Sequence, residues 1–399
     1  MTRDALTFAA LASAAVPGLA PISAEAVRPR PGERFRVGFV EDAEHRRWVV
    51  RLPVDAVAAA QQDASVPLLS MLARRVPFSV PSPKGFVGLR DGRRAMVYPL
   101  ISGYSLVLYT VPPGTGLAAE VGRALAHLHN VDRRLFEEAA LPSYDAAECR
   151  RRHLIEVDRG AHTGLVPAGL LSRWERMLED VSWWRFAATP IHGRLDGNHL
   201  LVAFSSDEDA ASGRIRAIVG WENAQVGDPA EDFAALIAAA APDTVDTVLE
   251  AYAMSRLESP DPHLERRARL IAELRLVGDL LVAVAAKDDV TREAAVRALR
   301  RLNADVGDPE PRTEDSGEQA VSFVYEDGPA PDRLYKAGEV DGGLEEGRGE
   351  DTQNPPTGAA PRGGDATRHG ASASPMDARH GPHEVDPPSR LRAVRFDDE

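Results

Sequence analysis

Residues 191–202, IHGRLDGNHLLV, place several polar side chains between two short apolar runs. His192, Arg194, Asp196 and His199 all lie within this stretch. The layout is typical of a loop that carries reactive groups between two short strands. A loop of this kind normally offers a carboxylate as proton acceptor. Here the residue directly after His-Gly is Arg194, which stays protonated at physiological pH and cannot act as a base.

A second polar segment, residues 215–234, reads IRAIVGWENAQVGDPAEDFA. Its second half has the signals of a helix start, because Asp228 can act as N-cap and Pro229 fits the first helical position. Glu231 stands three residues after the cap, where a capping-box acid belongs. We therefore expect a helix from Pro229 to about Ala240.

The elements before these segments predict a small sheet within residues 30–101. Alternating apolar residues and turn signals indicate four strands in two hairpins, at 34–40, 47–52, 85–90 and 94–100. In the first strand Phe35, Val37 and Phe39 share one face. Residues 54–75 have helical composition, and Pro67 is expected to end or kink that helix.

The remaining folded part is predominantly helical. Helical periodicity covers 116–131, most of 144–183, 245–257 and 262–303, and only short strands are expected around the loop at 191. A small sheet lobe before a larger helical lobe suggests an α+β, two-lobe, protein-kinase-like fold. We assign residues 1–101 to the first lobe, 102–305 to the second, and 306–399 to a tail.

Charge is distributed unevenly along the chain. The net charge is −14, and residues 306–399 carry 21 acidic against 10 basic residues, so the body is nearly neutral. We expect no large basic patch and no nucleic-acid partner. The tail has 24 Gly or Pro residues among 94 and no apolar period, which predicts a disordered acidic segment. Such a segment is a candidate for binding a protein partner.

The chain is expected to be soluble and cytoplasmic. The most apolar segment, residues 6–21, is interrupted by Pro17, Gly18 and Pro21 and is too short to span a membrane. Small residues follow its apolar stretch as in a secretory signal, but the head MTRD has no net positive charge. Cys149 is the only cysteine, so no intrachain disulfide and no cysteine-rich metal site can form.

Both polar segments resemble the signatures of one enzyme family. HGRLDGNHLLV resembles the catalytic loop of aminoglycoside and macrolide phosphotransferases, H-G-D-L-x-x-x-N, whose last place is His in some macrolide-type members. The segment 215–234 resembles the second signature, I-D-W-x-x-x-x-x-G-D-P-x-x-D. Spacing and lobe order match from about residue 5 to 303. The resemblance implies a kinase-like fold and phosphoryl transfer from ATP or GTP to a small hydroxylated molecule.

The resemblance also identifies what this chain has lost. The family's general base falls on Arg194 and its metal-binding Asp on Gly220, while His199 takes the place of the metal-binding amide. Losing a positioned base costs about 10² to 10⁴ in rate, and one imidazole is a poor Mg²⁺ site. Asp196 and Glu222 could replace the lost acids if the local backbone is extended, although solvated loop acids are the commoner case.

The family's scaffold residues are retained in this chain. They are His192, Gly193, Asp228, Pro229 and Asp232, and the resemblance implies that Asp232 is buried beneath the catalytic loop and holds its backbone. His127 and His129 are expected to be core or helix-surface histidines.

Nucleotide-contacting positions can be carried over in the same way. Arg51 takes the place of the phosphate-gripping Lys, with Val49 on the same strand face near the base. Asp63 is the only acid on the helix that should supply the partner of that Lys. The segment 95–103 would be the hinge, with main-chain groups around Val97 and Tyr98, and Leu201 would close the pocket from below. Ordinary core packing is the alternative for these apolar residues.

Three functions remain open from the sequence. The first is a degenerate, pseudokinase-like phosphotransferase that binds a nucleotide or small ligand with little transfer and a doubtful need for Mg²⁺. The second is an active ATP- or GTP-dependent small-molecule O-phosphotransferase that uses displaced acids. In the third, the acidic tail is the functional element and the folded body anchors it. No motif in the helices at 144–180 and 242–300 identifies an acceptor.

Overall fold

The structure is a computed structural model that describes residues 2–29, 33–206 and 212–306. All of these residues lie within one compact unit. The predicted tail, apart from Val306, lies outside the described residues, so its disorder and its protein partner stay predictions.

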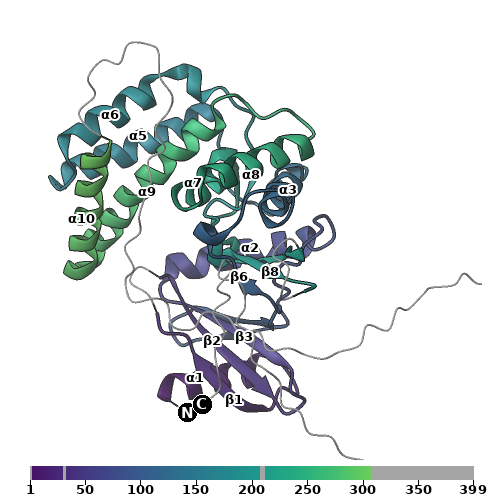
Figure 1. Cartoon of the computed structure of the whole chain (residues 1–399). Helices are drawn as coiled ribbons and strands as arrows, with labels where there is room; N and C mark the ends of the chain where they lie inside the picture. Colours follow the sequence, from purple (N-terminus) through teal and green to yellow (C-terminus); the bar gives the residue numbers. More distant parts are fainter. Residues whose placement is uncertain (1, 30–32, 207–211, 307–399) are drawn as a thin grey trace, which may run out of the picture. The chain divides into compact units, whose positions relative to one another are not determined.

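The first lobe is built on an antiparallel sheet, shown in Figure 1. Its strand order is β1-β2-β3-β5-β4. The strands are β1 (Pro21–Ala26), β2 (Phe35–Asp42), β3 (Arg47–Pro53), β4 (Gly85–Gly88) and β5 (Arg94–Pro99). Both predicted hairpins are present, with β2 paired to β3 and β4 paired to β5.

The first lobe contains one helix and one strand more than the sequence predicted. Helix α1 (Arg3–Ala15) lies on the sheet and buries Phe8 and Ala12 against it. Gly38 in β2 permits this close packing, because a Cβ atom there would lie 2.3 Å from the Cγ atom of Phe8. Apolar residues of the segment 6–21 are therefore part of the core of this lobe.

Helix α2 (Ala56–Leu72) runs through Pro67, so the expectation that Pro67 ends the helix is wrong. Asp55 caps the helix by accepting a hydrogen bond of 2.7 Å from the main-chain nitrogen of Ala58. Beyond Pro67, Leu68 and Leu72 are completely buried. The free energy gained by burying these side chains offsets the cost of the main-chain hydrogen bond that proline removes.

Short strands surround the polar loop, as predicted. One small sheet has the order β6-β8-β9, and β7 pairs with β10 in another. Their bounds are β6 (Tyr104–Ser105), β7 (Thr189–Ile191), β8 (Leu200–Ala203), β9 (Arg214–Ile218) and β10 (Gln225–Gly227). The loop between β7 and β8 thus has both ends fixed in sheet structure.

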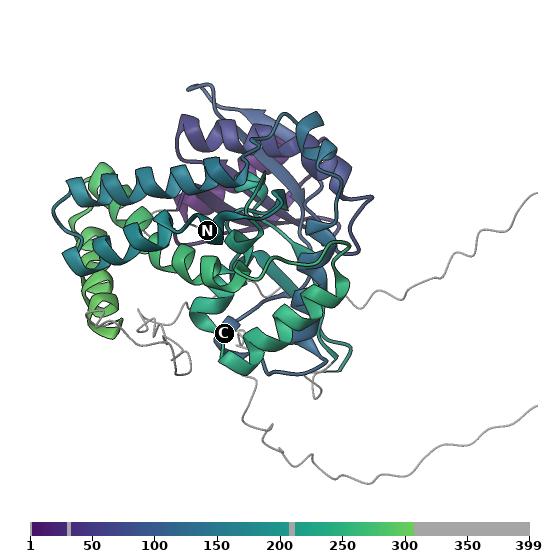
Figure 2. The same cartoon turned by 90° about the horizontal axis from the view of Figure 1, so that it is seen from above.

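The second lobe is mostly helical and has two apolar clusters. One cluster includes α3 (Leu117–His129), α7 (Ala234–Ala239) and α8 (Pro242–Ser255), and α3 lies beside α8. The other joins α5 (Ala146–His162), α6 (Ala168–Glu179), α9 (Leu264–Ala286) and α10 (Asp289–Asp305), which gather on one side of the lobe in Figures 1 and 2. Shorter elements are α4 (Arg134–Glu138), η1 (Leu108–Thr110), η2 (Val181–Trp184), η3 (Gly197–His199), η5 (Trp221–Asn223) and η6 (Pro229–Asp232).

The helix predicted from Pro229 to Ala240 is divided. Asp228 does act as a cap, accepting from the main-chain nitrogen of Ala230 at 2.9 Å, but the first turn is the 3₁₀ helix η6. The α-helix α7 begins only after Phe233. The two-lobe α+β prediction is confirmed. Within the described ranges, no helix is long and apolar enough to cross a membrane.

Candidate functional site

The polar loop between β7 and β8 is held from below by Asp232. This carboxylate is 2% exposed and accepts hydrogen bonds of 2.8 Å from the main-chain nitrogens of His192 and Gly193. Gly193 has φ +82°, and a Cβ atom there would lie 2.2 Å from the carbonyl oxygen of Asn223. The structure therefore shows Asp232 anchoring the loop, as predicted, through hydrogen bonds to main-chain nitrogens.

A buried network completes the support of Asp232. The Nε2 atom of His129 lies 3.2 Å from the Asp232 carboxylate, and its Nδ1 atom lies 2.8 Å from the Tyr252 hydroxyl. Burial on its own raises the pKa of Asp232, but the hydrogen bonds and charges of His129 and His192 together outweigh burial, so the net shift is downward. Burial lowers the pKa of His129. His129 is thus a core histidine and His127 an exposed one, as predicted.

Arg194, at the position of the expected base, points to the surface of the lobe. Its side chain is 58% exposed and lies 3.3 Å from the carboxylate of Asp279 in α9. A pair this exposed contributes little to stability. No carboxylate stands at this position of the loop, and the guanidinium is available to solvent.

Asp196 is committed to its own loop. It accepts a hydrogen bond of 2.8 Å from the main-chain nitrogen of Asn198, and its Oδ1 atom lies 3.1 Å from Nδ1 of His199. Burial opposes ionisation of Asp196, but the contact with His199 lowers its pKa below the usual value. The Asp196 side chain is still 39% exposed, so this acid is partly solvated while its charge faces an imidazole.

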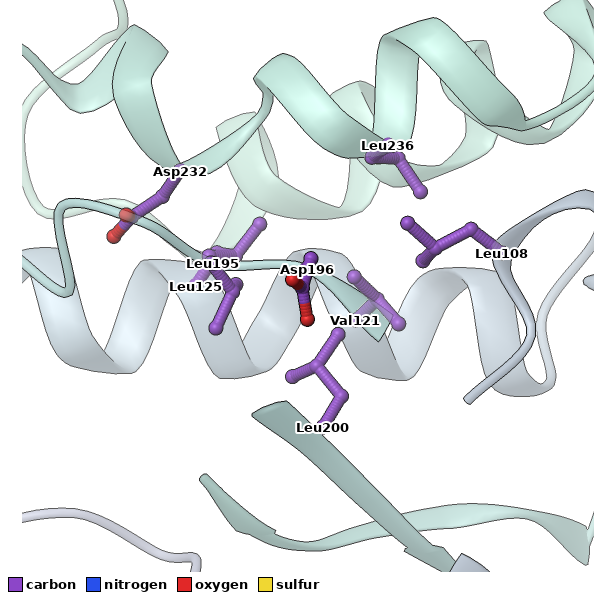
Figure 3. A pocket seen from close by; sticks show the side chains of 8 residues that line it. All are labelled: Leu108, Val121, Leu125, Leu195, Asp196, Leu200, Asp232 and Leu236. Atoms are coloured by element: carbon purple, nitrogen blue, oxygen red, sulfur yellow. The ribbon is translucent and has the colours of Figure 1, made fainter. Parts of the chain in front are cut away.

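A small cavity lies beside the loop, shown in Figure 3. Its volume is about 10 Å³, which is close to the room that one water molecule needs. The apolar part of its lining consists of Leu108, Val121, Leu125, Leu195, Leu200 and Leu236. Asp196 lies among these side chains in the figure, while the Asp232 carboxylate points away from them. This cavity is too small for a ligand and is part of the packing that supports the loop.

Gly220, at the expected metal-binding Asp, adopts the left-handed conformation with φ +84° and ψ 44°. A Cβ atom there would lie 2.3 Å from Cδ2 of His199 and 2.6 Å from its Nε2. The imidazole of His199 therefore fills the space into which a side chain at position 220 would project. Throughout the described residues, no group of three His, Cys, Asp or Glu side chains could hold a metal ion. Gly220 itself has no side chain to offer a metal, and the metal-binding roles expected of His199 and Glu222 stay predictions.

His192 is fully buried beside His199, with ring centroids 4.9 Å apart. Its Nε2 atom donates to the carbonyl oxygen of Val219 at 2.9 Å, while the buried Nδ1 atom has no hydrogen-bond partner within the described part of the chain. Burial lowers the pKa of His192 to about 4. This imidazole is therefore neutral near pH 7 and has a structural role in the loop.

Glu222 forms an ion pair with Arg51 of β3, so the expectation of a solvated loop acid is wrong here. The two side chains are only 6% and 13% exposed, and the Arg51 guanidinium lies over the Phe35 ring at 4.2 Å. Asp63, the expected partner of Arg51, lies instead 2.7 Å from Nε of Arg94. The arginine at the phosphate-gripping position is thus paired with an acid of the second lobe.

The expected base-binding residues lie on two different faces of the sheet. Val49 and Tyr98 pack together in a small cluster, whereas the side chain of Val97 belongs to the cluster beneath α1. The carbonyl oxygen of Val97 accepts from the main-chain nitrogen of Lys84 at 2.8 Å, and Tyr98 pairs with Val49 in the sheet. Their main-chain groups are engaged in the sheet, which corrects the expectation that they are available to a base.

Leu201 in β8 is buried, and its side chain is on the opposite face of the strand from Leu200 and Val202. Those two neighbours belong to the large apolar cluster that includes α3, α7 and α8. Leu201 pairs with Ser105 of β6, close after the segment expected to be the hinge. Its placement is compatible with the position predicted below a base.

Known proteins share this fold. The sequence model of the phosphotransferase enzyme family matches residues 25–271. The chain belongs to this family. A macrolide 2′-phosphotransferase, MphH from Brachybacterium faecium, is 27% identical, with a TM-score of 0.59 over 74% of this chain and 96% of that one. The GDP and kanamycin complex of the aminoglycoside phosphotransferase APH(2″)-IIIa is 18% identical, with a TM-score of 0.64 over 74% and 98%.

A curated relative is similar over a shorter length. The uncharacterized protein YcbJ of Bacillus subtilis (strain 168) is 24% identical over 232 residues, which are 54% of this chain and 71% of that protein. Together these similarities confirm the predicted family resemblance and its kinase-like fold.

One buried cluster next to the site was missed by the sequence analysis. Arg267 of α9 is fully buried and pairs with Asp228 at 2.7 and 3.0 Å and with Asp261 at 2.6 and 2.9 Å. It also donates to the carbonyl oxygen of Trp183 at 2.8 Å. Asp261 lies six residues before Arg267, whereas Asp228 and Trp183 are 39 and 84 positions away. An arginine within an apolar helical period was the available signal, and it did not indicate the distant partner Asp228.

Proposed function

We propose that this protein is a degenerate phosphotransferase that binds a nucleotide or another small ligand with little or no phosphoryl transfer. The observation that carries the proposal is the arrangement at Gly220. A left-handed glycine stands where the family's metal-binding carboxylate belongs, and the ring of His199 fills the adjacent space. A side chain cannot be restored there without moving that ring.

The second requirement of phosphoryl transfer is also missing. Transfer needs a carboxylate that orients and deprotonates the attacking hydroxyl, together with metal ions that neutralise the phosphates. Arg194 offers a cation in place of that carboxylate and is paired with Asp279. With neither group in place, we expect the rate of transfer to be lower by several orders of magnitude.

Ligand binding is proposed on separate grounds. One structural relative is a GDP and kanamycin complex and another is a macrolide 2′-phosphotransferase. We infer that ATP or GTP and a small hydroxylated molecule are the ligand classes to test, with little contribution from Mg²⁺. Retention of the loop anchor, in which Asp232 bonds to His192 and Gly193, supports an ordered site.

An active enzyme is the second candidate, and one observation favours it. Asp196 and His199 form a carboxylate–imidazole pair with a separation of 3.1 Å. A carboxylate beside an imidazole is a common arrangement for general-base catalysis. In this alternative, the base has moved along the loop and the product is a phosphorylated small molecule.

Calorimetry separates the two candidates. ATP and GTP are titrated into the full chain with excess Mg²⁺ and with a chelator, and phosphorylated products are then sought with hydroxylated antibiotics and with water as acceptors. We expect binding that changes little with Mg²⁺ and no turnover above background. Turnover near 1 per second, within the usual range of enzymes, that is lost in Asp196→Asn would establish the active alternative.

A further inference from the structure

The ion pair between Arg51 and Glu222 joins the two lobes at a functionally placed residue. Arg51 is on β3 of the first lobe and Glu222 on η5 of the second. By the family resemblance, the residue at position 51 is the one that grips nucleotide phosphates. The carboxylate of Glu222 is therefore paired with the same guanidinium group that would bind a phosphate.

Glu222 is held in this position by its neighbours. The adjacent Trp221 is 1% exposed and donates from Nε1 to the carbonyl oxygen of Ile218 at 2.8 Å. The main-chain nitrogen of Ala224 bonds to the carbonyl oxygen of Trp221 and closes the turn. Side-chain rotation can still move the carboxylate, but the turn that carries it is anchored in the core.

Arg51 is fixed from the opposite side. Its guanidinium lies 4.2 Å from the centre of the Phe35 ring, and the acid expected to pair with it, Asp63, is bonded to Arg94. Both members of the pair are largely shielded from water, so their attraction is screened less than that of a surface pair. A phosphate group that approaches Arg51 must displace this carboxylate or lie beside it.

The arginine of the polar loop is engaged elsewhere as well. Arg194 is exposed and paired with Asp279, and the described residues include no group of three His, Cys, Asp or Glu side chains that could hold a metal ion. Asp196 adds a further negative charge in the polar loop, with His199 beside it. A polyphosphate that reaches Arg51 would therefore meet an arginine already paired with Glu222.

We propose that Glu222 determines the ligand class of this site by competing with anionic phosphate for Arg51. With the pair intact, the site prefers an uncharged nucleoside over the corresponding triphosphate. This inference rests on the proposed nucleotide-binding function and adds the residue that selects among nucleotide ligands.

The test measures affinity for three kinds of probe in the presence of a chelator and at constant ionic strength. The probes are adenosine and guanosine, ATP and GTP, and inorganic tripolyphosphate. We expect the unmodified chain to bind its nucleoside at least as tightly as the matching triphosphate. Glu222→Gln should raise the affinity for triphosphate and tripolyphosphate about tenfold, equivalent to one charged interaction, and leave nucleoside affinity unchanged.

Three further variants sharpen the result. Glu222→Asp keeps the charge on a shorter side chain and should give a smaller gain than Glu222→Gln. Asp63→Asn removes a half-exposed acid that is paired elsewhere, with Arg94, and should change no affinity. The double variant Glu222→Gln with Arg51→Gln should lose the gain. Urea denaturation of each variant verifies that it is folded.

The possible outcomes distinguish this inference from the proposed function. The proposed competition between Glu222 and phosphate is wrong if Glu222→Gln changes the affinity for triphosphate and tripolyphosphate by less than twofold. It is also wrong if the variant raises the affinity for nucleoside by the same factor. Both conclusions hold even if nucleosides bind. If no nucleoside or nucleotide binds to any variant but tripolyphosphate gains in Glu222→Gln, the nucleotide function is wrong and the competition stands. Absence of tripolyphosphate binding in every variant overturns the competition.

Discussion

The packing of His199 against Gly220 predicts a specific pattern of stabilities. Replacing Gly220 by Ala places a Cβ atom 2.3 Å from Cδ2 of His199, so the imidazole must leave its present position beside Asp196 and His192. The left-handed backbone costs about 1 to 2 kcal/mol for a residue with a Cβ atom, and overpacking adds about 1 to 3 kcal/mol. We expect Gly220→Ala to lower the free energy of unfolding by about 2 to 5 kcal/mol.

A matched glycine isolates the two contributions. Gly92 has the same φ of +84° in the turn between β4 and β5, and a Cβ atom there would meet nothing within 4 Å. Gly92→Ala should therefore lower the free energy of unfolding only by the backbone cost of about 1 to 2 kcal/mol. Urea unfolding of Gly220→Ala, His199→Ala and their double variant should give a coupling free energy of about 1 to 3 kcal/mol.

Gly220→Ala and Gly92→Ala could instead lower the free energy of unfolding equally, with a coupling free energy near zero. That result would refute the predicted clash between His199 and a side chain at position 220. Such a result would mean that the imidazole moves freely and does not close the metal position. If the coupling is found, any attempt to restore the metal-binding acid by Gly220→Asp must also replace His199, and Arg194→Asp would still be needed for the base.

Three other predictions follow from buried charged or titrating groups. Arg267→Met leaves Asp228 and Asp261 without their counter-charge and should lower the free energy of unfolding by about 3 to 5 kcal/mol in urea denaturation. Burial lowers the pKa of His192 to about 4, so the unfolded chain binds an extra proton between about pH 6.5 and 4. Stability should fall by up to about 3 kcal/mol as the pH drops through this window, and His192→Gln should reduce that slope. Burial raises the pKa of the Cys149 thiol to about 12, so thiol reagents at pH 8 should label it only after unfolding.

Local patterns were sufficient to predict most of the architecture. The alternation around Phe35 and Val37 identified a strand, and the polar loop at His192 was placed correctly between two strands. These features depend on neighbours in sequence, where side-chain period and turn chemistry act directly. Pro67 was misleading because the burial of later leucines in α2, a tertiary effect, outweighed a local helix-breaking signal.

Pairings between distant residues could not be predicted in the same way. Glu222 and Arg51 are 171 positions apart, and no local feature of either segment indicates the other. Likewise, the sequence showed that Gly220 lacks a carboxylate, but only the backbone conformation reveals that His199 occupies the adjacent space. Partner choice between distant charges is decided by the packing of the lobes, which composition and periodicity do not describe.

The way Asp232 holds the polar loop has a consequence for how this family can diverge. The carboxylate bonds to main-chain nitrogens, which every residue except proline possesses, and not to the side chains that would perform the reaction. The side chain at position 194 can therefore be exchanged with little penalty to folding. Loss of catalysis and loss of structure become independent events, and a chain with this anchor can keep an ordered loop while its original chemistry disappears.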